Sequence, residues 1–304
     1  MKEKILYLNL YIGILILLSS EMLLLSGNAF IKKWFFCFAW WSFILILDSI
    51  NFRKDNSSPL SKSTKTFLVT IFISVFIWLI FEIINIRLNN WHYHGLPQNT
   101  AERWLGYFLS FATVVPALME ISQFLYSLFK KKNVPIPPLK VTPSLLKLCI
   151  LSGIISILLV IIWPNIFFPL IWLSFIFILE PVNYKLGNKT FLGEFERKST
   201  SLMISWLASG LLAGILWEFW NFWTGSHWEY SIPYFNFWKI FQMPLLGYLG
   251  FIPFAIEVFA FYQLLISLFH YIKKKKLARI FIFLLLLIFY FVSFYLIDTF
   301  NLKT

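Results

Sequence analysis

Long apolar runs separated by short polar segments follow one another along the whole chain. Crossing a bilayer as a helix takes about 20 residues, and nine runs come close to or exceed that length. Their pattern predicts membrane-spanning helices over residues 5–25, 34–51, 66–86, 104–129, 145–163, 166–183, 201–222, 241–271 and 277–299. The chain is therefore expected to be all-α, a polytopic integral membrane bundle of about nine transmembrane helices.

An acidic residue followed three positions later by asparagine recurs where four of these runs end. Residues three apart share one face of a helix, so each pair presents a carboxyl and an amide in one direction. The pairs are Asp48/Asn51, Glu82/Asn85, Glu180/Asn183 and Glu218/Asn221, with a fifth, Asp298/Asn301, near the C-terminus. We expect each amide to donate a hydrogen bond to the acid of its own pair.

Further motifs recur at a similar spacing and favour an internal duplication. The matched motifs are Trp91-x-Tyr93 with Trp228-x-Tyr230, Gly106-Tyr107 with Gly247-Tyr248, and Pro116-x-x-x-Glu120 with Pro253-x-x-x-Glu257. Over all matches the offset stays between 132 and 141 residues. Four runs per copy is an even number, so both copies would enter the membrane in the same sense, related by an axis along the membrane normal. Both prolines are expected to kink their helices.

This duplication would divide the chain into four parts. Residues 1–129 would form the first four-helix repeat and residues 145–271 the second, joined by a cytoplasmic Lys- and Pro-rich linker at 130–144. Prolines in the linker prevent one continuous helix. Residues 272–304 would add a basic loop and a transmembrane helix without a counterpart. We expect that helix to be peripheral and Asp298 to lie at the membrane interface.

Composition and charge agree with a membrane protein. The chain of 304 residues is 59% hydrophobic and 13% charged, whereas soluble domains are about a quarter charged. The net charge of +12 does not indicate nucleic-acid binding, because 20 of the 26 Lys and Arg residues fall in the N-terminus and the loops after even-numbered runs. Basic loops mark the cytoplasmic side. We therefore expect a multi-pass protein of the cell membrane, the bacterial inner membrane, with its N-terminus in the cytoplasm and its C-terminus outside.

The sequence lacks the motifs that would indicate a cofactor. It contains no P-loop, no H-E-x-x-H and no G-x-S-x-G, which argues against nucleotide-driven transport, metalloprotease and serine-hydrolase chemistry. Cys37 and Cys149 lie in apolar runs, where free thiols are usual. His92, His94 and His227 lie in the two matching loops and are expected to hydrogen-bond at the interface. We predict no cofactor and no metal site.

Eight of the 14 acidic residues fall in the apolar runs or at their ends, and no Lys or Arg lies deep enough in a run to neutralise them. A charge at the bilayer centre costs about 3 kcal/mol on insertion scales, so these acids are expected to face the bundle interior. The candidates for catalysis are Glu218, Glu82, Glu257 and Glu120. Spacing alone leaves three interpretations open: polar clamps between helices, a path for protons or cations, and acid catalysis on a lipid.

Aromatic residues make up 21% of the chain, and many are expected to anchor helices at the membrane interface. Trp217, Trp220, Trp223 and Trp228 instead cluster around Glu218. A protonated acid beside aromatic faces suits a reaction through a carbocation, although the same cluster equally suits binding of a flat apolar ligand. The candidate substrate-binding residues are Asn221, Asn85, Trp217, Trp220, Trp228, Tyr230, Trp91, Tyr93, Asp48, Asn51, Glu180 and Asn183.

One block of the second half resembles the membrane carotenoid hydratases and, more loosely, the two-repeat integral-membrane lycopene cyclases. The block consists of Glu218, Thr224-Gly225, Trp228-x-Tyr230 and Met243-Pro244-Leu245 before an apolar helix. In those families an intramembrane acid protonates a polyene terminus. The resemblance implies that Glu218 is a proton donor and that Tyr230 lies near the ligand, with Glu82 and Tyr93 as counterparts. The chain departs from the pattern of these families in having Gly247-Tyr248-Leu249-Gly250-Phe251 after Pro244 and Glu257 within the next helix.

These observations favour an intramembrane enzyme that acts on an isoprenoid- or carotenoid-like lipid by carboxylic-acid catalysis, through hydration or cyclisation. The alternative is a proton-coupled carrier or a lipid-binding membrane module without catalysis. The expected partners are the lipid bilayer and an apolar small molecule or lipid, and nucleic acid is not expected. The sequence predicts no oligomeric state.

Overall fold

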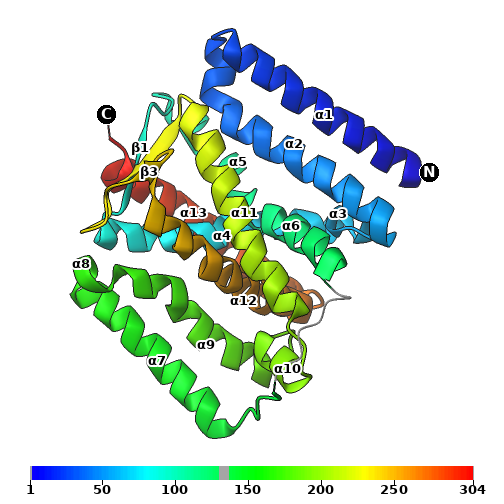
Figure 1. The fold of residues 1–304 in the computed structure, drawn as a ribbon, viewed down its shortest axis with the longest axis vertical. Coiled ribbons are helices and arrows are strands. Elements are labelled where there is room, and N and C mark those ends of the chain that lie inside the picture. Colours follow the sequence, from blue (N-terminus) through cyan, green and yellow to red (C-terminus); the bar gives the residue numbers. More distant parts are fainter. Residues whose placement is uncertain (1, 130–136, 304) are drawn as a thin grey trace.

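The computed structural model describes residues 2–129 and 137–303. Within these residues, nine helical segments are long and apolar enough to cross a membrane, which confirms the predicted all-α polytopic bundle. Part of the predicted linker, residues 130–136, lies outside the described residues. The two ends of the chain lie on opposite sides of the bundle (Figure 1), as an odd number of spans requires.

The first half of the chain folds into helices and one short strand. These elements are α1 (Lys2–Leu25), α2 (Ala29–Asp55), α3 (Pro59–Lys62), α4 (Thr64–Leu88), β1 (Trp91–His94), α5 (Thr100–Phe111) and α6 (Val114–Phe129). Side-chain oxygens cap the starts of two spans. The side-chain oxygen Oδ1 of Asn28 accepts from the Ile31 N–H at 3.0 Å before α2. The Ser63 hydroxyl accepts from the Thr66 N–H at 3.2 Å before α4. These bonds satisfy N–H groups that a first helical turn leaves unpaired.

The second half of the chain contains more short elements. Its elements are α7 (Pro143–Ile162), α8 (Pro164–Phe167), the 3₁₀ turn η1 (Phe168–Leu170), α9 (Ile171–Lys185), α10 (Phe191–Glu196), α11 (Ser201–Trp223), β2 (His227–Tyr230), β3 (Lys239–Ile240), β4 (Met243–Pro244), the 3₁₀ turn η2 (Leu245–Gly247) and α12 (Tyr248–Ile272). Strands β3 and β4 pair antiparallel. The last span, α13 (Lys276–Leu296), ends in a π turn, η3 (Ile297–Asn301).

Two helix pairs flank the centre of the bundle. The α1–α2 pair and the α7–α9 pair lie at opposite margins, with α4, α6, α11 and α12 between them (Figure 1). A glycine allows the close approach in each pair. A Cβ added at Gly13 would lie 2.9 Å from the Ser42 carbonyl oxygen, and one at Gly153 would lie 2.7 Å from the Ser174 carbonyl oxygen. Small residues at such positions let membrane helices pack backbone against backbone.

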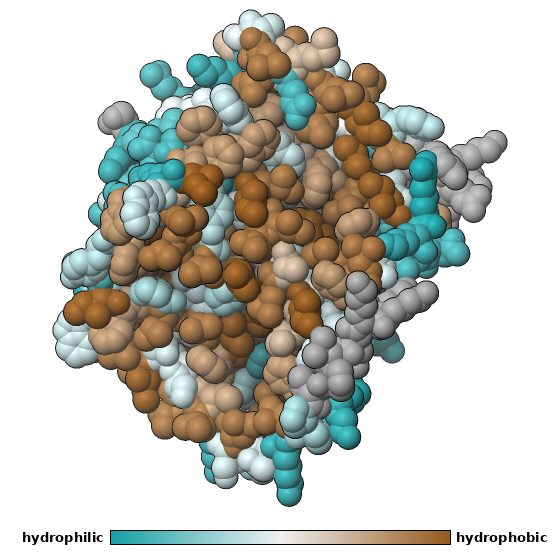
Figure 2. All heavy atoms as spheres, in the orientation of Figure 1, coloured by the Kyte–Doolittle hydropathy of each residue, from teal (hydrophilic) through white to brown (hydrophobic). Residues whose placement is uncertain are grey.

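The outer surface of the bundle is apolar over a broad area. Figure 2 shows brown, apolar residues filling the middle of one face and teal, polar residues gathering towards its margins. Large apolar side chains such as Leu15, Ile161 and Phe281 are half exposed or more. An apolar surface of this extent is covered by lipid in a folded protein. The chain is a multi-pass membrane protein.

Three predicted spans differ from the structure. The span predicted over 166–183 is regular α-helix only from Ile171, since α8 and η1 precede it. The span predicted over 104–129 breaks between α5 and α6, so the kink expected at Pro116 is a full interruption, because proline offers no N–H to the preceding turn. Ser74 of α4 occupies the break. Its hydroxyl donates to the Phe111 carbonyl at 2.6 Å and accepts from the Val115 N–H at 3.0 Å. The span predicted from residue 241 becomes regular α-helix only at Tyr248, since β4 and η2 precede it.

Candidate functional site

The two matching polar loops meet as an antiparallel two-stranded sheet. Trp91 of β1 lies opposite Tyr230 of β2, and Tyr93 lies opposite Trp228. Alternate residues of a strand face the same side, and so do paired residues of adjacent strands. All four aromatic side chains therefore share one face of the sheet, and all four line a cavity beneath it.

An asparagine at the end of each preceding helix holds its strand in place. Asn85 Nδ2 donates to the Trp91 carbonyl at 2.8 Å, and its Oδ1 accepts from the Asn90 N–H at 2.9 Å. Asn221 Nδ2 likewise donates to the Trp228 carbonyl at 2.8 Å, and its Oδ1 accepts from the Trp228 N–H at 2.9 Å. The prediction that each amide bonds the acid of its own pair is therefore wrong, because a carboxamide matches both groups of a peptide unit.

The tyrosines of the two strands, rather than the asparagines, bond the acids. Tyr93 Oη donates to Glu82 Oε1 at 2.5 Å, and Tyr230 Oη donates to Glu218 Oε1 at 3.1 Å. Both tyrosines lie in the loops outside the spans. Burial and then the neighbouring carboxyl raise the pKa of Tyr93 and of Tyr230 well above 10. Each phenol therefore stays protonated and can donate at neutral pH.

Glu82 and Glu218 are both fully buried but differ in how their oxygens are used. Glu82 Oε1 also accepts from Trp78 Nε1 at 2.8 Å and from Trp91 Nε1 at 3.1 Å. Its Oε2 accepts from Asn301 Nδ2 at 2.9 Å. Glu218 Oε2, in contrast, has no hydrogen-bond partner among the described residues. One of the two matched acids is fully hydrogen-bonded, and the other has a free oxygen.

An aromatic cavity lies between the halves, beside these acids. It has two connected parts that share Trp78, Tyr93, Trp228, Tyr230 and Phe251, and we call it the aromatic cavity. The space that a water-sized molecule can occupy is about 90 Å³ in the larger part and about 40 Å³ in the smaller part. A lining of aromatic rings with a few polar groups is typical of small-molecule sites.

Two of the predicted tryptophans take different places around Glu218. Trp217 lines the larger part of the aromatic cavity. Trp220 does not line the cavity and instead packs on Trp40 of α2 with ring centroids 4.9 Å apart. Trp40 also contacts Trp217 at 5.5 Å. Trp220 therefore supports the cavity wall from behind rather than contacting its contents.

The two cations at the cavity mouth are both paired. Lys33 Nζ lies 3.0 Å from Glu102 Oε1, and Arg103 Nη2 lies 2.6 Å from Asp298 Oδ2. Both side chains line the larger part of the cavity. Since each positive charge already has a carboxylate, the mouth does not present an unmatched charge to an anionic ligand.

Glu120 and Glu257, predicted as catalytic, lie away from the aromatic cavity. Asn51 Nδ2 donates to Glu120 Oε2 at 2.7 Å. Glu257 Oε1 accepts from the Phe175 N–H at 3.0 Å, near the start of α9. None of the four fully buried glutamates is among the residues that line either part of the cavity. Glu82 and Glu218 bond the cavity residues Tyr93 and Tyr230, whereas the partners of Glu120 and Glu257 lie outside the cavity. Their hydrogen bonds join neighbouring helices.

The pairs Asp48/Asn51 and Glu180/Asn183, predicted as substrate-binding, also make structural contacts. Asp48 Oδ1 accepts from the Leu60 N–H of α3 at 2.9 Å. Glu180 Oε2 accepts from the Phe191 N–H of α10 at 2.8 Å. Asn183 Nδ2 donates to the Ala260 carbonyl of α12 at 2.8 Å. Each acid caps a short helix and satisfies its first N–H groups, and none of these residues lines the aromatic cavity.

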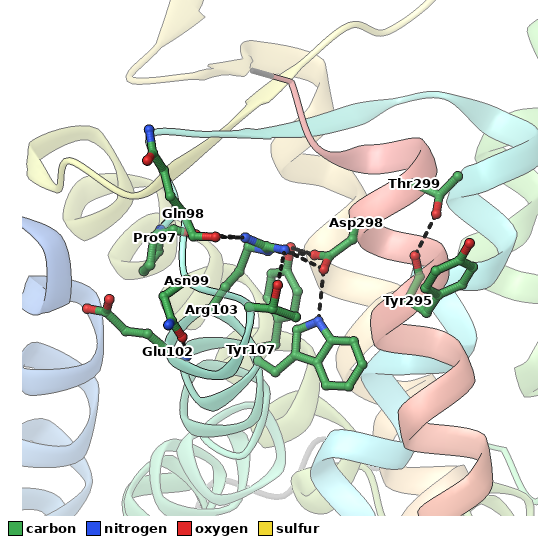
Figure 3. A network of polar contacts seen from close by, with 11 residues as sticks. Pro97, Gln98, Asn99, Glu102, Arg103, Tyr107, Tyr295, Asp298 and Thr299 are labelled. Carbon is green, nitrogen blue, oxygen red and sulfur yellow. Dashed lines mark hydrogen bonds and ion pairs between the residues drawn. The ribbon is translucent and has the colours of Figure 1, made fainter.

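Sequence reasoning missed the partners of Asp298. Figure 3 shows Arg103 and Tyr107 of α5 pointing towards this carboxylate. Arg103 Nε donates to Oδ1 at 2.8 Å, Tyr107 Oη donates to Oδ1 at 3.0 Å, and Trp104 Nε1 donates to Oδ2 at 2.9 Å. The expectation that no Lys or Arg neutralises these acids is wrong at Asp298. Most of α13 is exposed, as expected for a peripheral helix, but its end, η3, joins the bundle through Asp298 and Asn301. The sequence did contain a signal for this pairing: Arg103 stands immediately before the predicted span 104–129, and Asp298 stands at the end of the span 277–299.

The loop histidines lie beside the sheet. His94 stacks on His227 with ring centroids 5.7 Å apart. His92 is buried, and this burial, followed by the charges of Lys303 and His94, lowers the pKa of His92 below 6.5. Within residues 2–129 and 137–303, no three or more His, Cys, Asp or Glu side chains are grouped so that they could hold a metal ion.

No protein-family model, curated protein or solved structure matches this chain. Assignment of an activity therefore depends on the chemistry of the aromatic cavity and its two acids.

Proposed function

We propose that this protein is an intramembrane enzyme that protonates a carbon–carbon double bond of an isoprenoid-like lipid, with Glu218 as the proton donor. The observation that carries the proposal is the position of Glu218: its Oε2 has no hydrogen-bond partner among the described residues, and its Oε1 accepts from Tyr230, whose ring lines the aromatic cavity. A carboxyl oxygen without a hydrogen-bond donor can itself carry a proton and deliver it.

The arrangement of donors favours Glu218 over Glu82 for this role. Glu82 accepts four hydrogen bonds, at 2.5 to 3.1 Å, over its two oxygens. A proton on Oε1 would have to displace one of its three donors, and Oε2 keeps only one lone pair beside its bond from Asn301. Glu218 accepts a bond from Tyr230 on the oxygen opposite its free one, and the Trp228 indole N–H also faces this carboxyl. Tyr230 would orient the carboxyl and stabilise the carboxylate that forms after proton transfer.

The proposed reaction begins when Glu218 transfers its proton to one carbon of a double bond, leaving a carboxylate and a carbocation. In a hydration, a water molecule adds to the cation and returns a proton to the carboxylate. In a cyclisation or isomerisation, a neighbouring C–H bond loses its proton to the carboxylate instead. The faces of Trp217 and Trp228 would stabilise the cation through their ring quadrupoles. The resemblance of the Glu218 block to carotenoid hydratases and lycopene cyclases supports the same step.

A proton-coupled carrier is the second candidate. Four glutamates, Glu82, Glu120, Glu218 and Glu257, are fully buried in the spans, and none has a Lys or Arg partner among the described residues. Acids of this kind also line proton paths in transporters. Uptake of an apolar substrate into liposomes that depends on a pH gradient would favour this function, and a simple hydratase or cyclase would not show it.

The test compares lipid extracts of cells that lack the gene with extracts of complemented cells by untargeted mass spectrometry. We expect a lipid shifted by the mass of water, or an isomer with a new retention time, in cells with the wild type. Glu218→Gln should not restore this product. Glu196→Gln, an exposed acid that bonds Tyr184, is the matched control and should restore it. Full product formation by Glu218→Gln would exclude Glu218 as the donor.

A further inference from the structure

A second groove, apolar except for Arg279, lies between α4, α12 and α13, apart from the aromatic cavity. Its volume is about 440 Å³. Residues from all three helices form its walls, among them Val69, Phe72, Leu268, Ile272, Phe283 and Leu286. Arg279 is the one charged residue of its lining. We call it the α13 groove.

The α13 groove is closed at one end. There Phe76 of α4 packs on Phe289 of α13 with ring centroids 5.0 Å apart, and Tyr290 Oη donates to the Phe72 carbonyl. These contacts fasten α13 to α4. Arg279 lies ten residues before Phe289, which corresponds to about 15 Å along the helix. That distance is about half of the hydrocarbon thickness of a bilayer, so the groove extends through one leaflet.

The open end of the α13 groove is strongly basic. Lys65 lies one helical turn before Val69 on the same face of α4, and residues 273–276 between α12 and α13 are all lysine. These lysines and Arg279 are exposed. No acidic residue occurs in residues 64–69 or 269–282. Among the described residues, Arg279 has no ion-pair partner.

We propose that the α13 groove binds an anionic phospholipid, with one acyl chain in the groove and its phosphate at Arg279. The guanidinium group can bond two phosphate oxygens at once, and the surrounding lysines favour a headgroup that carries a net negative charge. A zwitterionic lipid offers the same chain but no net charge to this basic mouth. The occupant comes from the leaflet on the lysine-rich side.

Native mass spectrometry of the purified full chain tests this assignment. The protein would be released from micelles that contain equal amounts of phosphatidylglycerol and phosphatidylcholine with identical chains. We expect one retained phosphatidylglycerol per chain, at several-fold higher occupancy than phosphatidylcholine. Arg279→Gln should remove this preference, and Leu286→Trp, which fills the groove, should lower retention of both lipids. Arg197→Gln is the matched control, since Arg197 is an exposed arginine paired with Glu194, and it should bind as the wild type does.

A measurement on the wild-type chain does not depend on the folding of variants. Phosphatidylglycerol with a diazirine on its acyl chain would be photocrosslinked to the protein, and the labelled peptides mapped. Labels concentrated in α4, α12 and α13, and reduced by excess phosphatidylglycerol but not by phosphatidylcholine or inorganic phosphate, support the proposal. The proposal would be overturned by equal retention of the two lipids by the wild type. It would also be overturned if Arg197→Gln lost the preference for phosphatidylglycerol as fully as Arg279→Gln, or if labels were spread evenly over all lipid-facing helices.

Discussion

Replacing Glu82 by glutamine should destabilise the protein, whereas the same change at Glu218 should not. The difference follows from the number of donors that each carboxyl accepts. Glu82 accepts three hydrogen bonds on Oε1 and one on Oε2. A glutamine can keep an oxygen towards the three donors, but its NH₂ group then faces the donating amide of Asn301. Two donors cannot bond each other, so Asn301 Nδ2 loses its 2.9 Å bond and keeps only a long contact, 3.4 Å, with the Glu82 backbone carbonyl.

The size of the effect can be worked out from these contacts. An unsatisfied buried donor costs about 1–3 kcal/mol, so we expect a loss of about 2 kcal/mol for Glu82→Gln. Glu218→Gln keeps the acceptor for Tyr230 and changes an oxygen that has no partner. Its effect on the free energy of unfolding should stay within about 1 kcal/mol.

Thermal unfolding followed by tryptophan fluorescence, in one detergent and at one protein concentration, would measure the difference. At about 2–4 °C for each kcal/mol in chains of 150 to 250 residues, Glu82→Gln should lower Tm by several degrees. Glu196→Gln serves as a control for the change of charge. If Glu218→Gln and Glu82→Gln lowered Tm equally, the count of accepted hydrogen bonds would not explain how these acids contribute to stability.

Three further outcomes are expected. Tyr230→Phe removes the bond to Glu218 and should lower turnover at least tenfold in the lipid assay. Its loss of stability, about 1 kcal/mol, should leave the chain folded. Unchanged turnover would contradict a role of Tyr230 in orienting the Glu218 carboxyl. Because the pKa of His92 is lowered in the folded state, the unfolded chain takes up a proton first as pH falls below about 6.5, so Tm should fall between pH 7.5 and pH 5, and His92→Gln should weaken this dependence. Gly214→Ala would place a Cβ 2.2 Å from the Phe251 ring and cost about 1–3 kcal/mol, and added Phe251→Ala should recover part of that loss.

The spans could be predicted from the sequence because the length of an apolar run is set by the bilayer. The places where helices are interrupted within these spans were not predicted. The break between α5 and α6 depends on Ser74, a residue of another helix that bonds both sides of it. The start of α12 depends on β4, whose partner strand β3 lies only a few residues away but carries no clear β pattern. Contacts between elements, rather than local preference, decide these boundaries.

For the site, the sequence predicted which residues gather but not which atoms bond. Glu218, Tyr230 and Trp228 do lie together, because the Trp-x-Tyr spacing places both rings on one side of a strand. Periodicity on one helix does not tell which distant strand or helix supplies a partner. The bond of Asn85 to the Trp91 backbone and the bond of Asn301 to Glu82 each join a helix to a different element, so neither could be predicted from one helix alone. The grouping of the motifs into two repeats stays a prediction.

The register of the β1–β2 pair limits how these loops can change in evolution. Loops on membrane proteins usually tolerate insertions and deletions, but a shift of one residue along a strand reverses which side every side chain faces. A single inserted residue between α4 and Trp91, or between α11 and Trp228, would turn a tyrosine away from its glutamate. The lengths of these two connections should therefore be constant among the protein's relatives. The longer segment between Tyr230 and Lys239 has no such constraint, so natural length variation should be concentrated there.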